Sequence, residues 1–237
     1  MKRAAAAVMA AVLLVMLPAC GGGGGSDSAE DDIEDDGGST DTSPRTDQAV
    51  AEEAVLRLSD FPTEWRSTAV PGGTAAANVE SNRALADCMG RPRPEEIRTA
   101  LADSEDFSAQ DTRRVSSSVQ VVRTVEIAED DFTALKSDKA LECHKAQIDA
   151  EFARQLPPEA SPQTTLERLT MPQFGDDTVA YRVAATTLDR GAQVRTFIDL
   201  VFFRKGRTEV SVNFLNVGVP FPGDLERTVL QRIVARL

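Results

Sequence analysis

The fold of this chain is decided by residues 178–216, TVAYRVAATTLDRGAQVRTFIDLVFFRKGRTEVSVNFLN. This stretch contains three strand-like runs, 178–188, 193–204 and 208–216, rich in β-branched and aromatic residues that alternate with polar ones. The connections between the runs, 189–191 and 205–207, are short and each carries a glycine, as tight turns require. Connections this short join antiparallel strands, so the stretch predicts an antiparallel meander.

The register of the meander is predicted from the residues that must share one apolar face. A turn at Arg190-Gly191 pairs the first two runs as follows: Val179 with Phe202, Tyr181 with Leu200, and Val183 with Ile198. A three-residue loop, Lys205 to Arg207, extends the same face to the third run through these pairs: Phe202 with Val210, Leu200 with Val212, and Ile198 with Phe214.

The other face of the meander is expected to carry Arg182, Asp199 and Asn213 in a row across the three strands. Side chains on adjacent strands lie about 5 Å apart, so these three can interact. Two interpretations are open. One is an ordinary Arg182–Asp199 ion pair on a solvated face, and the other is a polar track that binds a ligand.

The remaining pattern predicts helices before and after the strands. Helices are expected over 48–57, over 81–89, from Pro94 to near Ala102, from Asp130 or Asp131 to about Gln155 with a break near Ser137, and after Gly223-Asp224. Two further strands are expected over 116–127 and 164–171. This order predicts an α+β fold, an antiparallel meander sheet with helices packed on one face. Roughly 190 residues, 48–237, are enough for a single globular domain.

The N-terminal residues have the composition of an export signal. Lys2 and Arg3 precede an apolar run that ends at Leu17-Pro18-Ala19-Cys20. The run is shorter than the ~20 residues a transmembrane helix needs, so residues 1–19 are predicted to be a lipoprotein signal peptide. Cys20 resembles the residue that bacterial lipoproteins acylate. This resemblance implies that Cys20 is the acylated first residue of the mature chain, with palmitate-type chains that anchor the protein to the extracytoplasmic face of the cell membrane.

Residues 20–47 are predicted to be a flexible tether between the lipid anchor and the domain. Positions 21–47 hold nine acidic residues and one basic residue, and so carry most of the net charge of −12. A segment of glycine, serine and acids cannot bury enough apolar surface to offset the entropy of ordering. The domain itself has no basic stripe, so we expect no nucleic-acid partner.

Two cysteines remain in the domain, Cys88 and Cys143. An exported protein meets oxidising conditions, so we predict a disulfide between them, the alternative being two separate buried thiols. His144 is the only histidine, and no paired ligand spacing predicts a metal or any other cofactor. It lies on the apolar side of its helix, which favours a core histidine hydrogen-bonded to backbone or to groups near Glu142 over a catalytic base.

Several short motifs together resemble known proteins. They are Leu58-Ser59-Asp60-Phe61-Pro62 followed by Trp65, Cys88 in a short helix, Val115-Ser116-Ser117-Ser118-Val119, Cys143 in a long helix, and Phe174-Gly175-Asp176 before the meander. With these motifs the chain resembles uncharacterised exported lipoproteins of actinobacteria and, more distantly, the extracellular sensor-like domains of actinobacterial Ser/Thr kinases. It departs from the kinase-linked domains in offering one candidate disulfide instead of two. The resemblance implies a non-enzymatic envelope protein.

The sequence contains no phosphate-binding glycine loop, no pair of metal-ligating histidines and no nucleophile elbow, so we do not expect an enzyme. We predict a membrane-tethered binding or sensing module for a small or lipid-like ligand. The alternative is a structural or assembly lipoprotein that binds another envelope protein. An apolar cavity between the sheet and the helices would favour the first function, and an exposed apolar patch the second.

Overall fold

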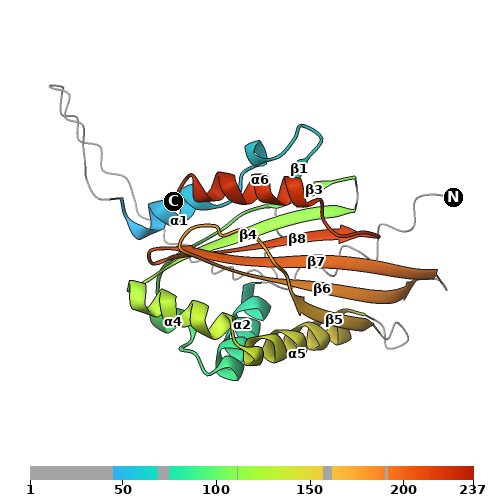
Figure 1. The fold of residues 1–237 in the computed structure, drawn as a ribbon, viewed down its shortest axis with the longest axis horizontal. Helices are drawn as coiled ribbons and strands as arrows, with labels where there is room; N and C mark the ends of the chain where they lie inside the picture. Colours follow the sequence, from blue (N-terminus) through green and yellow to red (C-terminus); the bar gives the residue numbers. More distant parts are fainter. Residues whose placement is uncertain (1–44, 69–74, 111, 157–161, 190–191) are drawn as a thin grey trace, which may run out of the picture.

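The computed structural model describes residues 45–68, 75–110, 112–156, 162–189 and 192–237 (Figure 1). The predicted signal peptide, Cys20 and nearly all of the predicted tether lie outside these residues. None of the described helices is long and apolar enough to cross a membrane.

An eight-stranded antiparallel sheet forms the centre of the domain. Its strand order is β1-β3-β4-β8-β7-β6-β5, and β2 also pairs with β4. The strands are β1 Arg66–Thr68, β2 Arg98–Asp103, β3 Asp106–Ala109, β4 Arg113–Val122, β5 Gln163–Arg168, β6 Asp177–Asp189, β7 Ala192–Lys205 and β8 Thr208–Val217. The predicted meander is therefore present as β6, β7 and β8.

Helices cover both faces of this sheet. They are α1 Asp47–Ala54, the 3-10 turn η2 Leu58–Asp60, α2 Ala75–Met89, α3 Pro94–Ile97, α4 Val125–Leu135, α5 Asp138–Gln155 and α6 Gly223–Val234. α1 and α6 lie on one face, and α2, α4 and α5 lie on the other (Figure 1). The α+β class and the antiparallel sheet are confirmed, but the helices, predicted on one face, occupy two.

Strand β7 shows why both faces are covered. Its residues Leu200 to Phe203 are all apolar, and Leu200, Val201 and Phe203 are completely buried. A strand that is buried on both sides reads as a continuous apolar run instead of an alternating one. Each face of the sheet therefore needs its own layer of helices.

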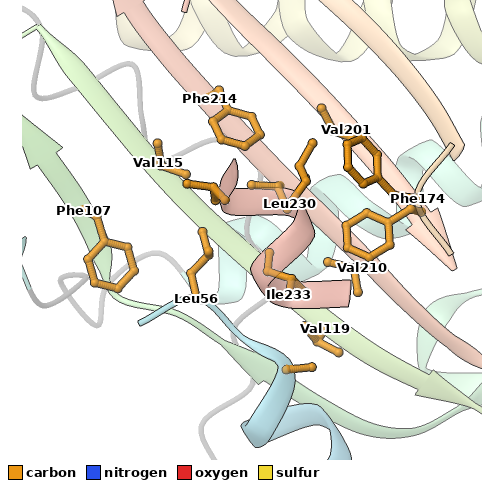
Figure 2. Packing of buried hydrophobic residues seen from close by; sticks show 14 of the residues in the cluster. Leu56, Phe107, Val115, Val119, Phe174, Val201, Val210, Phe214, Leu230 and Ile233 are labelled. Atoms are coloured by element: carbon orange, nitrogen blue, oxygen red, sulfur yellow. The ribbon is translucent and has the colours of Figure 1, made fainter. Parts of the chain in front are cut away.

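The core beneath α6 is formed by alternate residues of the central strands (Figure 2). Leu230 and Ile233 of α6 are fully buried against apolar side chains of β4, β7 and β8. Trp65 belongs to the same core, is 3% exposed, and stacks on Phe61 with ring centroids 4.5 Å apart. Its indole ring thus serves the packing of the domain.

The register between β6 and β7 is as predicted, with Tyr181 opposite Leu200. The predicted register between β7 and β8 is wrong, because the turn has two residues, Gly206 and Arg207. Gly206 has φ +58°, which suits the first position of a two-residue hairpin turn. Val210 therefore lies opposite Phe203 instead of Phe202. Because β7 is apolar on both sides, the rule of one shared apolar face could not select the register.

Two boundaries before the meander also differ from the prediction. Thr124 ends the strand early, since its Oγ1 accepts a hydrogen bond of 3.3 Å from the Ile127 amide and caps α4. The helix expected to run on to near Ala102 stops at Ile97, and the chain continues as β2. The break expected near Ser137 is confirmed, because Ser137 caps α5.

Candidate functional site

The register places six polar side chains together on the face of the sheet that α2, α4 and α5 cover. They come from β4 and β8 and form three directly opposed pairs: Ser116 with Asn213, Ser118 with Ser211, and Gln120 with Glu209. We call these six residues the polar floor. On the adjoining strand β7 the same face is apolar, with Leu200 opposite Asn213 and Phe202 opposite Ser211.

A cavity of about 150 Å³ lies between the polar floor and the helices. Five residues of the floor, all but Ser116, contribute to its wall. The opposite wall is mostly apolar and includes Leu85 and Ala86 of α2 and Phe132 and Leu135 of α4. A cavity of this volume accommodates a molecule about the size of benzene. The site thus has one polar side and one apolar side.

His144 of α5 forms part of the cavity wall and is 3% exposed. Its ring lies near Tyr181 and Phe202, with centroids 5.4 and 5.7 Å away. Burial, reinforced by the positive charge of Arg91, lowers the pKa of His144 to about 4, so the ring is neutral. The predicted core position is confirmed. The hydrogen bond predicted for His144 is not confirmed, because neither ring nitrogen has a partner among the described residues.

Two acidic groups, Asp131 and Glu209, are held by side chains that line the cavity. Arg91 Nε donates to Asp131 Oδ1 over 2.8 Å, and Gln120 Nε2 donates to Glu209 Oε2 over 2.5 Å. The other oxygen of Glu209, Oε1, has no hydrogen-bond partner among the described residues. Burial raises the pKa of Glu209 to about 7, and the nearby charge of Asp131 acts in the same direction. Near neutral pH this carboxyl group can therefore donate as well as accept a hydrogen bond.

Two of the helices that cover the cavity are tied to each other. Cys88 of α2 and Cys143 of α5 lie at disulfide distance, with their Cα atoms 5.9 Å apart. One helical turn further on, Gln147 Nε2 donates to Ser81 Oγ over 2.6 Å. The two cysteines singled out in the sequence are thus brought together, and their bridge fixes α2 above the polar floor.

Arg182 and Asp199 also meet, but beneath α6 on the other face of the sheet. Arg182 Nε donates to Asp199 Oδ1 over 2.6 Å, and Nη2 donates to Oδ2 over 2.7 Å. Asp199 is fully buried, so this face is not the solvated one that was predicted. Asn213 points to the opposite face, because the two-residue turn pairs it with Leu200. The predicted row of three is therefore not formed, and Asn213 alone lines the cavity.

A third charged residue joins the Arg182–Asp199 pair. Glu226, in the first turn of α6, is 4% exposed, and its Oε1 has no partner among the described residues. Burial raises the pKa of Glu226 to about 7, the charge of Asp199 adds to this effect, and Arg182 opposes it. We assign these three residues to the packing of α6, since the cavity lies on the other face.

The polar floor leaves a visible pattern in the sequence. Ser116, Ser118 and Gln120 occupy alternate positions, and so do Glu209, Ser211 and Asn213. Taken alone, this alternation predicts a polar face in contact with water. Only the position of α2, α4 and α5 over the same face turns it into the wall of a cavity.

Comparison with known proteins adds no further information: no family model matches the chain, and the curated proteins include no significant match. The functional argument therefore rests on the fold and on the cavity. The fold and the cavity define an α+β domain with a small cavity between its sheet and its helices, and this cavity has one polar wall and one apolar wall.

Proposed function

We propose that this protein is an exported lipoprotein whose domain binds a small, partly apolar ligand in the cavity above the polar floor. The observation that carries the proposal is His144, a buried neutral ring in the cavity wall whose two nitrogens lack partners among the described residues. Buried polar groups are ordinarily hydrogen-bonded, and a cavity with a few convergent polar groups is the usual form of a ligand site. The proposed function is binding or sensing, without catalysis.

The distribution of exposed apolar side chains favours this function over assembly with another envelope protein. The large hydrophobic residues exposed in the described part of the chain are Leu58, Val125, Leu188 and Val219. They belong to four different segments, η2, α4, β6 and the residues after β8, and two of them, Leu188 and Val219, lie at the same end of the meander. A docking surface would gather such residues in one patch.

The proposed lipid anchor at Cys20 places this binding site near a membrane. The predicted tether, residues 20–47, has an expected reach of roughly 25 to 30 Å as a flexible coil. That reach holds the domain close to the lipid headgroups while leaving it free to turn. The site would then sample molecules in the envelope just outside the membrane.

Native mass spectrometry of the full exported chain tests the proposal. We expect a co-purified small molecule on the wild-type protein that is absent from Ser211→Trp, because the indole fills the cavity from the polar floor. The control is Ala153→Trp, which adds the same ring to an exposed position of α5. A ligand retained by Ser211→Trp would place the binding site elsewhere.

A further inference from the structure

We infer that the ligand of this cavity is a small neutral molecule with an apolar body and at least one group that both donates and accepts hydrogen bonds. The apolar body faces α2 and α4, and the hydrogen-bonding group faces His144 and the polar floor. This inference rests on the proposed function, because it names the chemistry of the ligand for the same cavity.

The size of the cavity sets the first condition. About 150 Å³ holds a molecule with a single six-membered ring and a small substituent. A long acyl chain exceeds this space, so within the proposed class of small or lipid-like ligands the cavity favours the small ones. Leu85, Phe132 and Leu135 provide the surface against which an apolar ring or short hydrocarbon packs.

The hydrogen-bonding groups set the second condition. A neutral imidazole offers one donor and one acceptor, and the amide of Asn213 offers both kinds of group. Among the described residues neither His144 nor the side chains of Asn213 and Ser211 have hydrogen-bond partners, although His144 is 3% and Asn213 9% exposed. A ligand that supplies a matched donor and acceptor satisfies several of these groups at once, whereas a hydrocarbon leaves them unpaired.

The charges around the cavity set the third condition. Two arginines line it: Arg91 pairs with Asp131, whereas Arg98 is half-buried, forms no ion pair among the described residues, and has only a weaker electrostatic attraction to Asp103. An anionic ligand would therefore have to compete with Asp131 for Arg91 or rely on the half-buried Arg98 alone, and it would lie near the acidic Glu209.

A cationic ligand meets the opposite difficulty. Glu209 is the acid that lines the cavity, and it already interacts with Arg91 and Arg204 and accepts a hydrogen bond from Gln120. A bound cation would have to compete with both guanidinium groups in a partly apolar space, where an uncompensated charge is unfavourable. A neutral ligand avoids both conflicts.

A series of four probes of similar size tests this inference on the full chain. Toluene, benzamide, benzoate and benzylammonium share one ring and differ only in the substituent. We would titrate each into the ¹⁵N-labelled protein and follow the amide resonances of β4, β8 and α5. We expect benzamide to bind at least tenfold more tightly than each of the other three.

Variants of the polar residues localise the effect. Asn213→Leu and the smaller change Ser211→Ala should weaken benzamide binding about fivefold or more, and leave toluene binding equal or stronger. Gln193→Leu removes a side-chain amide from an exposed position of β7 and should leave all affinities unchanged. Ser211→Ala keeps the test valid if Asn213→Leu does not fold, as judged by circular dichroism.

The outcomes separate this inference from the proposed function. If benzoate or benzylammonium binds more tightly than benzamide, the inference that the ligand is neutral is overturned. If toluene binds as tightly as benzamide, the role of the polar floor is overturned. In those cases the cavity remains a binding site. The absence of binding by all four probes also overturns the inference, and the proposed function fails with it only if the wild-type protein carries no molecule in native mass spectrometry.

Discussion

Arg182 holds Asp199 with two hydrogen bonds, of 2.6 and 2.7 Å, beneath α6. The Asp199 side chain has no exposed surface, while the Arg182 side chain keeps 22% of its surface exposed. An ionised carboxylate without water is stable only when it is paired and hydrogen-bonded. The pair therefore allows a charged residue to occupy a position in β7 that the packing of α6 encloses.

Asp199→Leu should destabilise the domain, because it leaves the guanidinium of Arg182 without its partner. We expect a loss of about 3 kcal/mol, the lower end of the range for breaking a buried pair, since Arg182 can regain some water. The double variant Arg182→Met with Asp199→Leu should recover most of this loss. Urea unfolding of the single and double variants measures both effects. A double variant that is no more stable than Asp199→Leu would contradict the explanation.

Glu226→Gln should make the stability of the domain less dependent on pH. The pKa of Glu226 is about 7 in the folded protein, against an ordinary value of 4.5, so the folded state holds its proton more tightly than the unfolded state. Stability is therefore lost as pH rises from about 4.5 to about 7. At about 1.4 kcal/mol for each pH unit between the two pKa values, the loss amounts to roughly 3 kcal/mol.

The measurement is urea unfolding between pH 5 and pH 8. Glu226→Gln should lower the slope of stability against pH without removing it, because Glu209 and Asp103 also have raised pKa values, of about 7 and about 6. Glu64→Gln changes an exposed carboxylate and serves as the control. A slope that is the same in Glu226→Gln and wild type would show that Glu226 is not the titrating group.

The meander was predictable because its turn residues and its apolar pattern are local. The expected strands agree with β6, β7 and β8 to within one residue at each end, and the pairing around Arg190-Gly191 is correct. The third strand was shifted because Phe202 and Phe203 are both core residues, on opposite faces. Local pattern cannot assign a strand to a face when helices cover both.

The candidate site was predictable only in part. Cys88 and Cys143 were paired correctly from the expected oxidising environment, and Arg182 was paired correctly with Asp199. The cavity was not predicted, because it depends on α2, α4 and α5, which precede the meander in the chain, lying over β4 and β8. Such long-range packing leaves no periodic signal in the sequence.

Cys20→Ser should abolish lipidation and release the protein from the membrane. The prediction follows from the apolar run that ends at Leu17-Pro18-Ala19-Cys20 and from the tether that comes after it. Metabolic labelling with a fatty-acid analogue, followed by fractionation of the cells, measures both effects. Cys88→Ser should keep the label and stay with the membrane. A labelled, membrane-bound Cys20→Ser protein would refute the assignment.

Loss of the Cys88–Cys143 bridge should weaken both the domain and its cavity. The two residues are 55 positions apart, and closing a loop of this length stabilises the folded state by about 4 kcal/mol in the chain-entropy model. Cys88→Ser is the informative variant, because Cys88 is exposed whereas Cys143 is 3% exposed and belongs to the core.

We expect Cys88→Ser to lower the urea midpoint to that of the reduced wild type, and a reductant to have no further effect on the variant. Benzamide binding should also weaken, because the bridge holds the α2 wall of the cavity against α5. Wild-type stability that does not respond to reductant would mean that the two sulfur atoms are not joined.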